Sequence, residues 1–119
     1  MAEALHQDLK AISEVFWARA WPRSVAAIEK QVKETLTKVG FSGETEQTIH
    51  YGSRVGRINL VVQRSGPPVA IEIDRLSARQ KSILKLRSFD GLRMIVLRRG
   101  LGAKPGPIAG IDLVISIEA

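Results

Sequence analysis

The sequence predicts an α/β domain, with a mixed β-sheet flanked by helices. Apolar residues recur at helical spacing in the first forty residues, and short apolar runs separated by Gly, Ser and Pro follow from residue 41 onward. A further helix is expected between two of these runs, which makes those two strands parallel by preference. At 119 residues the chain forms one domain, with an N-terminal helix in residues 1–21 and the core in residues 22–119.

Two helices are predicted at the start of the chain. The first covers residues 3–17 and carries one apolar stripe, Leu5, Leu9, Ile12 and Phe16. The second covers residues 22–39, since Pro22 suits the first turn of a helix and Gly40 suits its end. The stripe of the first helix can cover the core or form the interface of a homodimer, and the sequence leaves both open.

Five strands and a third helix are predicted after residue 41. The strands are expected at residues 44–51, 55–63, 69–74, 92–97 and 111–117. Gly52-Ser53 and Ser65-Gly66-Pro67-Pro68 are turn signals, and the second turn makes the strands on either side of it antiparallel. Ser77 and Gln80 form a capping box for a helix over residues 78–89. A Gly/Pro loop is expected at residues 100–110.

The positive charge is concentrated in one segment. The formal net charge is +6, yet residues 50–104 hold twelve Lys and Arg against three acids, a net +9. The remaining 64 residues hold six basic and nine acidic side chains, a net −3. Clustered cations favour nucleic acid, because neutralising phosphates is the main term in its affinity. A solvated basic face without a ligand is the alternative.

The composition also excludes several classes of protein. The chain has no Cys, which rules out disulfides and thiolate metal sites. No apolar run approaches the roughly 20 residues that span a bilayer. The N-terminus lacks the basic start and apolar centre of a signal peptide. We therefore expect a cytoplasmic protein with no membrane partner.

Polar side chains interrupt two neighbouring apolar strands. Asn59 is expected on the opposite side of its strand from Ile58 and Leu60, because side chains alternate along a strand. Glu72 and Asp74 share one face of the next strand, and the hairpin brings Asn59 and Glu72 side by side. Burying such groups is costly without a partner, and a hard cation such as Mg²⁺ prefers oxygen ligands. Lys81 and Lys85 of the following helix could orient the attacking water or hold a phosphate.

These elements resemble the PD-(D/E)XK restriction-endonuclease-like superfamily, particularly small phage and bacterial endonuclease-like proteins. The resemblance covers about residues 29–97 and depends on the strand Gly56-Arg57-Ile58-Asn59, the strand Ile71-Glu72-Ile73-Asp74 and the Arg- and Lys-rich helix that follows. It implies an endonuclease-like core that hydrolyses DNA phosphodiester bonds with Mg²⁺ or Mn²⁺. A homodimer is expected as well, because cutting both strands usually takes two sites.

The resemblance also implies roles for individual residues. The metal ligands would be Asn59, Glu72, the Ile73 carbonyl and Asp74, and the catalytic residues would be Asn59, Glu72, Asp74 and Lys81. Glu29 would be an accessory acid. The residues expected to bind nucleic acid are Arg54, Arg57, Arg75, Arg79 and Lys85.

The sequence departs from this family's pattern at two positions. Asn59 stands where the family has Asp, and the loss of a charge there should weaken metal binding. Asp74 stands where a catalytic Lys usually follows, and Lys81 of the next helix is placed to supply that amine.

Three alternatives remain open from the sequence. The chain could be a non-catalytic nucleic-acid-binding module on the same fold, or a protein-interaction domain whose basic face meets an acidic partner. Glu72 and Asp74 could also simply pair with Arg57, Arg75 or Arg79 on a solvated face of the sheet.

Overall fold

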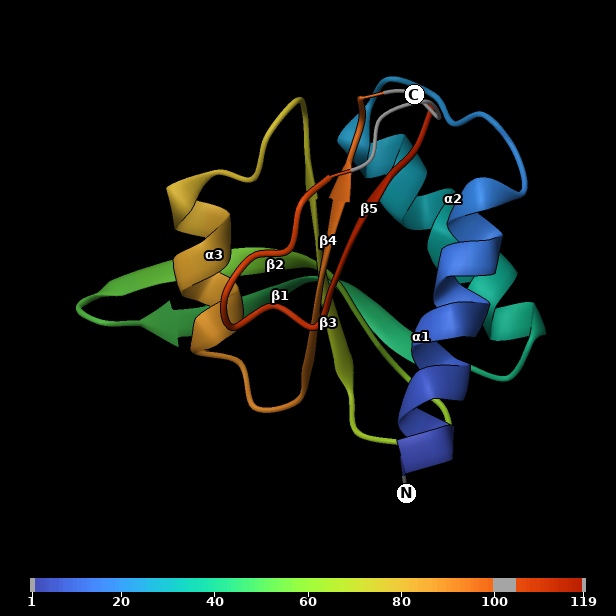
Figure 1. The fold of residues 1–119 in the computed structure, drawn as a ribbon, viewed down its shortest axis with the longest axis horizontal. Coiled ribbons are helices and arrows are strands. Elements are labelled where there is room, and N and C mark those ends of the chain that lie inside the picture. The colour runs from blue at the N-terminus through green and yellow to red at the C-terminus, as the bar shows by residue number, and fades with distance from the viewer. Residues whose placement is uncertain (1, 100–104, 119) are drawn as a thin grey trace.

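Two helices lead into three strands, and a third helix separates these from the last two strands (Figure 1). The computed structural model describes residues 2–99 and 105–118. Every predicted element is present. Their bounds are α1 (Ala2–Trp17), α2 (Val25–Lys38), β1 (Ser42–Tyr51), β2 (Arg54–Gln63), β3 (Val69–Asp74), α3 (Gln80–Arg87), β4 (Leu92–Leu97) and β5 (Leu113–Ser116).

The five strands form one mixed sheet in the order β1-β2-β3-β4-β5. The first three are joined by short turns and run antiparallel, whereas β4 is parallel to β3 and β5 is parallel to β4. The parallel pairing of β4 with β3 follows from the connection through α3, because a helical crossover brings the chain back to the end of the sheet where β3 begins. The predicted α/β class and mixed sheet are confirmed.

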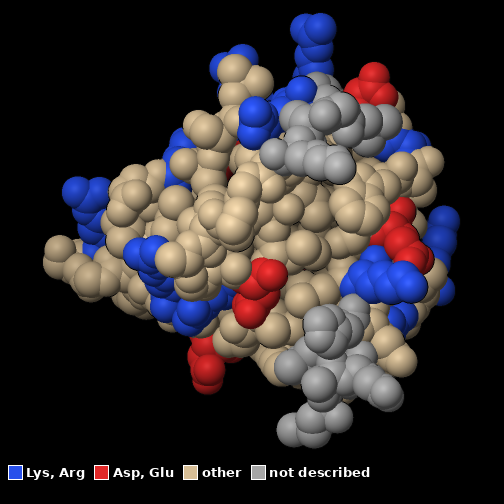
Figure 2. Space-filling model, in the orientation of Figure 1, with Lys and Arg blue, Asp and Glu red and all other residues tan. Residues whose placement is uncertain are grey.

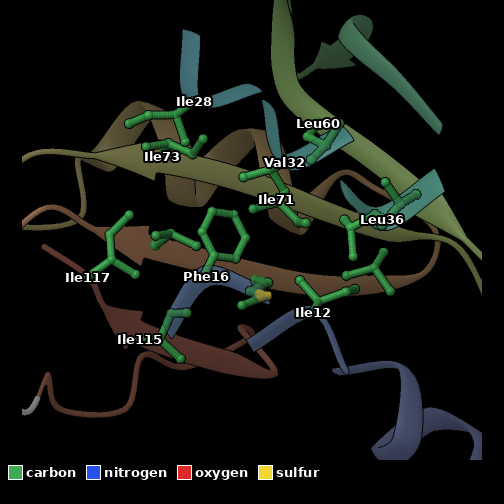
Figure 3. Close-up of a cluster of buried hydrophobic side chains, with 14 of the residues drawn as sticks. Ile12, Phe16, Ile28, Val32, Leu36, Leu60, Ile71, Ile73, Ile115 and Ile117 are labelled. Carbon is green, nitrogen blue, oxygen red and sulfur yellow. The ribbon is translucent and has the colours of Figure 1, made fainter. Parts of the chain in front are cut away.

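Helices cover both faces of the sheet. In Figure 1, α1 and α2 lie on one side and α3 lies on the other. The larger core cluster lies between the sheet and the first two helices, where side chains such as Phe16, Ile28 and Ile71 are fully buried (Figure 3). The smaller cluster lies under α3 and includes Leu86 and Ile95. All six residues of β3 are buried, so a polar side chain on this strand must find its partners inside the protein.

The alternation of side chains in β2 breaks at Asn59. Ile58 belongs to the cluster under α3, whereas Leu60 belongs to the cluster under α1 and α2, so the expectation that they share a face is wrong. Two backbone features explain the break. The ladder between β2 and β3 covers only Leu60–Val62, and Glu46, opposite Asn59 in β1, has a φ of 53°. We call the opening between β2 and β3 at Asn59 and Glu72 the fork.

The start of α3 is fixed by the end of β3. The helix is shorter than predicted, and the side chain of its N-cap residue, Arg79, makes no capping hydrogen bond. Instead Asp74 Oδ2 accepts a hydrogen bond from the Arg79 N–H at 3.0 Å, and Asp74 Oδ1 accepts one from Ser82 Oγ at 2.9 Å. The predicted capping box of Ser77 and Gln80 is therefore wrong, because the carboxylate that satisfies the free N–H comes from the preceding strand.

A buried carboxylate joins α1 to the turn between β2 and β3. Asp8 is fully buried and accepts hydrogen bonds from the Ser65 and Gly66 N–H groups at 3.2 and 3.0 Å. Arg64 forms an ion pair with it at 3.1 Å. Burial alone would raise the pKa of Asp8, but the hydrogen bonds from the Gly66 and Ser65 N–H groups, the Ser65 hydroxyl and the Arg64 side chain outweigh burial and hold the pKa below its usual value. The sequence pattern did not indicate this contact.

The apolar stripe of α1 serves as core cover. Ile12 and Phe16 have no exposed surface, and both belong to the larger core cluster (Figure 3). The side chain of Leu5 and residues 100–104 of the predicted loop lie outside the described residues. Within the described part of the chain, no helix is both long and apolar enough to cross a membrane.

Candidate functional site

Side chains replace the backbone ladder at the fork. The Asn59 N–H donates to Glu72 Oε2 at 2.9 Å, and the Ile73 N–H donates to Asn59 Oδ1 at 2.8 Å. The two side-chain oxygens stand where carbonyl oxygens would continue the ladder beyond Leu60. The structure thus brings Asn59 and Glu72 side by side. The side chain of each accepts a hydrogen bond from a backbone N–H of the other strand.

Two further carboxyl groups meet the amide of Asn59. Asn59 Nδ2 donates to Glu29 Oε2 at 2.7 Å and has a longer contact with Glu46 Oε2 at 3.4 Å. Glu29 reaches the fork from α2 and is 5% exposed. Glu29 was expected near the site, but Glu46 was not. The register could have found it, because the turn at Gly52-Ser53 places Glu46 opposite Asn59 in the hairpin.

The fork raises the pKa of Glu29 to about 8. Burial is the largest cause, and the contact with the Glu46 carboxyl and the charges of Glu46 and Glu72 add to it. The hydrogen bond from Asn59 opposes these effects without cancelling them. Glu29 is therefore mostly protonated at neutral pH, and the fork holds more carboxyl groups than its cations can neutralise.

One buried cation reaches the fork from α3. Lys85 Nζ forms an ion pair with Glu72 Oε1 and donates a hydrogen bond to the Arg57 carbonyl at 2.7 Å. Glu72 is fully buried and Lys85 is 5% exposed. Burial raises the pKa of Glu72, and the Lys85 and Asn59 contacts only partly offset it. Lys81 is exposed on the same helix, so the structure brings Lys85, rather than Lys81, to the acidic side chains.

Asp74 lies next to the fork but is already engaged. One carboxylate oxygen accepts from Arg79 Nε at 3.1 Å and from Ser82 Oγ, and the other accepts from the Arg79 N–H. These bonds fix α3 against β3. Its charge still contributes to the raised pKa of Glu72. A metal ion would have to compete with these bonds for Asp74.

The arginines expected to bind nucleic acid lie on the surface. Arg54, Arg57, Arg75 and Arg79 are all exposed. The first two belong to β2, and the other two follow β3. On the face shown in Figure 2, Lys and Arg lie mainly around the outline and other residues fill the centre. Basic groups therefore border this face without forming one patch on it.

A cavity of about 500 Å³ adjoins the fork. We call it the arginine pocket. Asn59 is part of both the fork and the wall of the pocket, so the two are continuous. The lining residues are Val25, Asn59, Ile73, Asp74, Arg75, Leu76, Ser77, Arg79 and Arg98.

The oxygen atoms of the fork suit a hard cation, but their arrangement is incomplete. Glu29, Glu46 and Glu72 carry the carboxylate oxygens that Mg²⁺ prefers. Across residues 2–99 and 105–118, however, no group of three or more Asp, Glu or His side chains is arranged to hold a metal ion. The Asn59 amide nitrogen contacts Glu29 and Glu46, and Lys85 pairs with Glu72. In the described structure, the carboxyl groups of the fork are thus engaged by Asn59 and Lys85 and do not form a ready-made metal-binding set.

No protein-family model matches this chain, and no curated protein matches it. The fork, the arginine pocket and the uneven charge are the features of the chain that bear on its function.

Proposed function

We propose that this chain is a nucleic-acid-binding domain of the endonuclease type, in which the fork hydrolyses a DNA phosphodiester bond with Mg²⁺ or Mn²⁺ and Asn59 limits the reaction. The observation that carries the proposal is the gathering of Glu29, Glu46 and Glu72 around Asn59. Glu29 and Glu72 are buried carboxyl groups with raised pKa values, and such groups are costly to stability and cluster at functional sites. The order of elements and the resemblance of the Ile71–Asp74 strand support an endonuclease-like core.

Most residues at or beside the fork have a part in this proposal. Glu29 and Glu72 would hold the ion, with Asn59 Oδ1, the Ile73 carbonyl and Asp74 as further oxygen ligands. When bound, Mg²⁺ would stabilise charge on the phosphate and lower the pKa of a bound water. Lys85 holds the carboxylate of Glu72 in place and would add positive charge near a bound phosphate. Lys81, being exposed, is better placed to contact the phosphate backbone than the fork.

Asn59 explains why the reaction would be limited. Its side-chain nitrogen donates to Glu29, and so occupies a position where a cation would otherwise neutralise the carboxyl group. A carboxylate at this position would keep the oxygen that accepts from the Ile73 N–H, and it would lose the donor. The Asn59→Asp variant therefore completes an acidic set with Glu29 and Glu72 that needs a cation.

DNA would be held by the basic residues that border the fork. Arg54 and Arg57 belong to the first half of β2, and Arg75 and Arg79 line the arginine pocket. Contacts from such residues to phosphates supply affinity without reading sequence. A homodimer would present two forks to a duplex and so account for cleavage of both strands.

A second candidate is a non-catalytic nucleic-acid-binding module. It is favoured by the ion pair between Lys85 and Glu72 and by the hydrogen bond from Asn59 to Glu29, which satisfy these side chains without metal. In that case the fork is a structural feature, and the basic residues alone carry the function.

Plasmid nicking and thermal unfolding, each with Mg²⁺, Mn²⁺ or EDTA, test the proposal on the native chain and on Asn59→Asp. We expect Asn59→Asp to be destabilised in EDTA, to regain stability with either metal and to nick supercoiled DNA. The native chain should nick at least roughly tenfold more slowly, since losing a charged ligand costs on the order of 1.4 kcal/mol or more. Adding Glu72→Gln to Asn59→Asp should abolish nicking, which controls for a contaminating nuclease.

The two candidates differ in the outcome for Asn59→Asp. If this variant gains neither metal-dependent stability nor nicking, yet binds DNA in a salt-dependent manner, the non-catalytic module is correct. If neither protein binds DNA or RNA even at low salt, a protein-interaction domain with an acidic partner replaces both candidates.

A further inference from the structure

The arginine pocket opens at the carboxyl ends of two parallel strands. Arg75 directly follows β3, and Arg98 directly follows β4, which pairs with it through Asp74 and Leu97. Arg79 is the N-cap residue of α3. In open α/β sheets, ligands bind in the crevice outside the carboxyl ends of the strands. The three arginines therefore surround the part of the sheet where this architecture places its ligands.

Two of these arginines are held in position by protein acceptors. Arg98 Nη1 donates to the Arg23 carbonyl at 2.8 Å, and Arg98 Nε donates to the Asp74 carbonyl at 3.4 Å. Arg79 Nε donates to Asp74 Oδ1 at 3.1 Å. Arg75 is exposed. Asp74 is the single acidic residue among the lining residues, so the pocket carries an excess of positive charge and favours an anion.

The size and walls of the pocket indicate more than a bare phosphate. Its volume of about 500 Å³ falls within the roughly 300–1,000 Å³ of small-molecule sites. Val25, Ile73 and Leu76 add apolar surface to the wall. Leu76 is 67% exposed, which leaves a large apolar side chain in water beside three cations. A flat, largely apolar ring attached to a phosphate would cover Leu76 while the phosphate meets the arginines.

We infer that the arginine pocket binds one nucleotide unit, with its phosphate on Arg75, Arg79 and Arg98 and its base against Leu76. Arginine binds phosphate through two parallel hydrogen bonds, and its planar group also stacks on bases. The inference rests on the proposed function for the source of the nucleotide, which is an unpaired or terminal nucleotide of a bound strand. Because Asn59 belongs to both sites, that nucleotide would lie directly beside the fork.

The test measures binding to the whole chain in EDTA, so that metal has no part in it. A short labelled DNA single strand with a 5′-phosphate is followed by fluorescence anisotropy. Adenosine monophosphate, ribose 5-phosphate, adenosine and inorganic phosphate compete with it. The variants are Arg75→Gln and Leu76→Ala, both at exposed side chains. Lys38→Gln is the control, because it removes one positive charge as Arg75→Gln does. Lys38 lies at the opposite end of α2 from Val25, which lines the pocket.

We expect adenosine monophosphate to displace the strand better than any of the other three competitors. Arg75→Gln should weaken the binding of adenosine monophosphate and of ribose 5-phosphate about tenfold, as expected for the loss of one charge-assisted hydrogen bond. Leu76→Ala should weaken the binding of adenosine monophosphate severalfold and leave the affinity for ribose 5-phosphate unchanged. Lys38→Gln should change neither.

Several outcomes would overturn the inference, and they leave the proposed function distinguishable. If the strand binds, adenosine monophosphate does not compete and Arg75→Gln behaves like Lys38→Gln, then the pocket holds no nucleotide while nucleic-acid binding stands. If inorganic phosphate and adenosine monophosphate compete equally well, the base makes no contribution to binding and the pocket is not a nucleotide site. If a labelled adenosine monophosphate binds but the strand does not, the pocket takes a free nucleotide and the proposed function fails.

Discussion

Asn59 ties three segments of the chain together through one short side chain and its own backbone. Its backbone N–H bonds Glu72 on β3, its side-chain oxygen bonds the Ile73 backbone, and its side-chain nitrogen bonds Glu29 on α2. Asp would retain the first two bonds and lose the third. A single atom, Nδ2, therefore decides whether the fork is satisfied by the protein alone or requires a cation.

Glu29 makes the stability of the metal-free protein depend on pH. Its pKa is about 8 in the folded protein against a usual 4.5, so its protonated form favours folding. This contribution is fully present below the unfolded pKa and is lost as the pH rises through about 8. Urea unfolding in EDTA at a series of pH values should show that the free energy of unfolding falls by on the order of a few kcal/mol between about pH 4.5 and about pH 8.

Glu29→Gln keeps the shape of this side chain and removes its titration. We expect the variant to flatten the pH dependence, whereas Glu34→Gln, at an exposed position of the same helix, should leave it unchanged. If Glu29→Gln and the native chain lose stability equally between acid and alkaline pH, Glu29 is not the titrating group.

Most of the residues at the fork could be predicted, but the lysine could not. The hairpin pattern correctly predicted Asn59 beside Glu72, although the strict alternation of side chains that it assumed fails in β2 at Asn59. Lys81 and Lys85 lie one turn apart on the same face of α3, so spacing cannot distinguish them. The choice depends on how the helix lies over β3, which the Asp74 contacts fix.

At the scale of elements, Asp8 holds α1 against the turn between β2 and β3. Asp8→Asn keeps the size of the side chain but breaks a buried ion pair with Arg64 and weakens two backbone contacts. We expect a loss of about 2–4 kcal/mol in the free energy of unfolding at neutral pH. Urea titration measures it, with Glu14→Gln, exposed on the same helix, as the control.

The effect of Asp8→Asn should itself depend on pH. The pKa of Asp8 is lowered in the folded protein, so its charged form stabilises folding above the unfolded pKa and the contribution disappears as the pH falls through the folded pKa. The difference between the variant and the native chain should therefore shrink in acid. A difference that stays constant down to pH 2 would assign the loss to packing instead of charge.

The elements were predictable where short-range chemistry fixes them. Gly and Pro turns placed the first three strands, and the crossover rule gave the parallel pair. The start of α3 was missed because its cap, Asp74, belongs to the preceding strand. The break in β2 was missed because Glu46 adopts a positive φ of 53°, which a residue other than Gly rarely does and no local pattern signals.

At the scale of the whole molecule, uneven charge should govern association. Residues 50–104 carry +9 and the rest of the chain −3. We expect the logarithm of the DNA-binding constant to fall linearly with the logarithm of salt concentration. Arg57→Gln should reduce the slope by about 1, as for the loss of one phosphate contact. Lys38→Gln, outside the basic segment, should leave the slope unchanged, and a native slope near zero would show that the partner is not a polyanion.

The reciprocal bonds at the fork link the opening of the site to the backbone of the sheet. The amides of Asn59 and Ile73 are protected from solvent by side-chain oxygens alone, whereas their neighbours toward the hairpin turn between β2 and β3 are protected by the ladder. Hydrogen exchange at these two amides can thus occur through a local opening, at a free-energy cost below that of global unfolding. Displacing the side chain of Asn59 or Glu72 breaks the next pair of hydrogen bonds between β2 and β3. A ligand bound at the fork would therefore change how cooperatively the sheet opens.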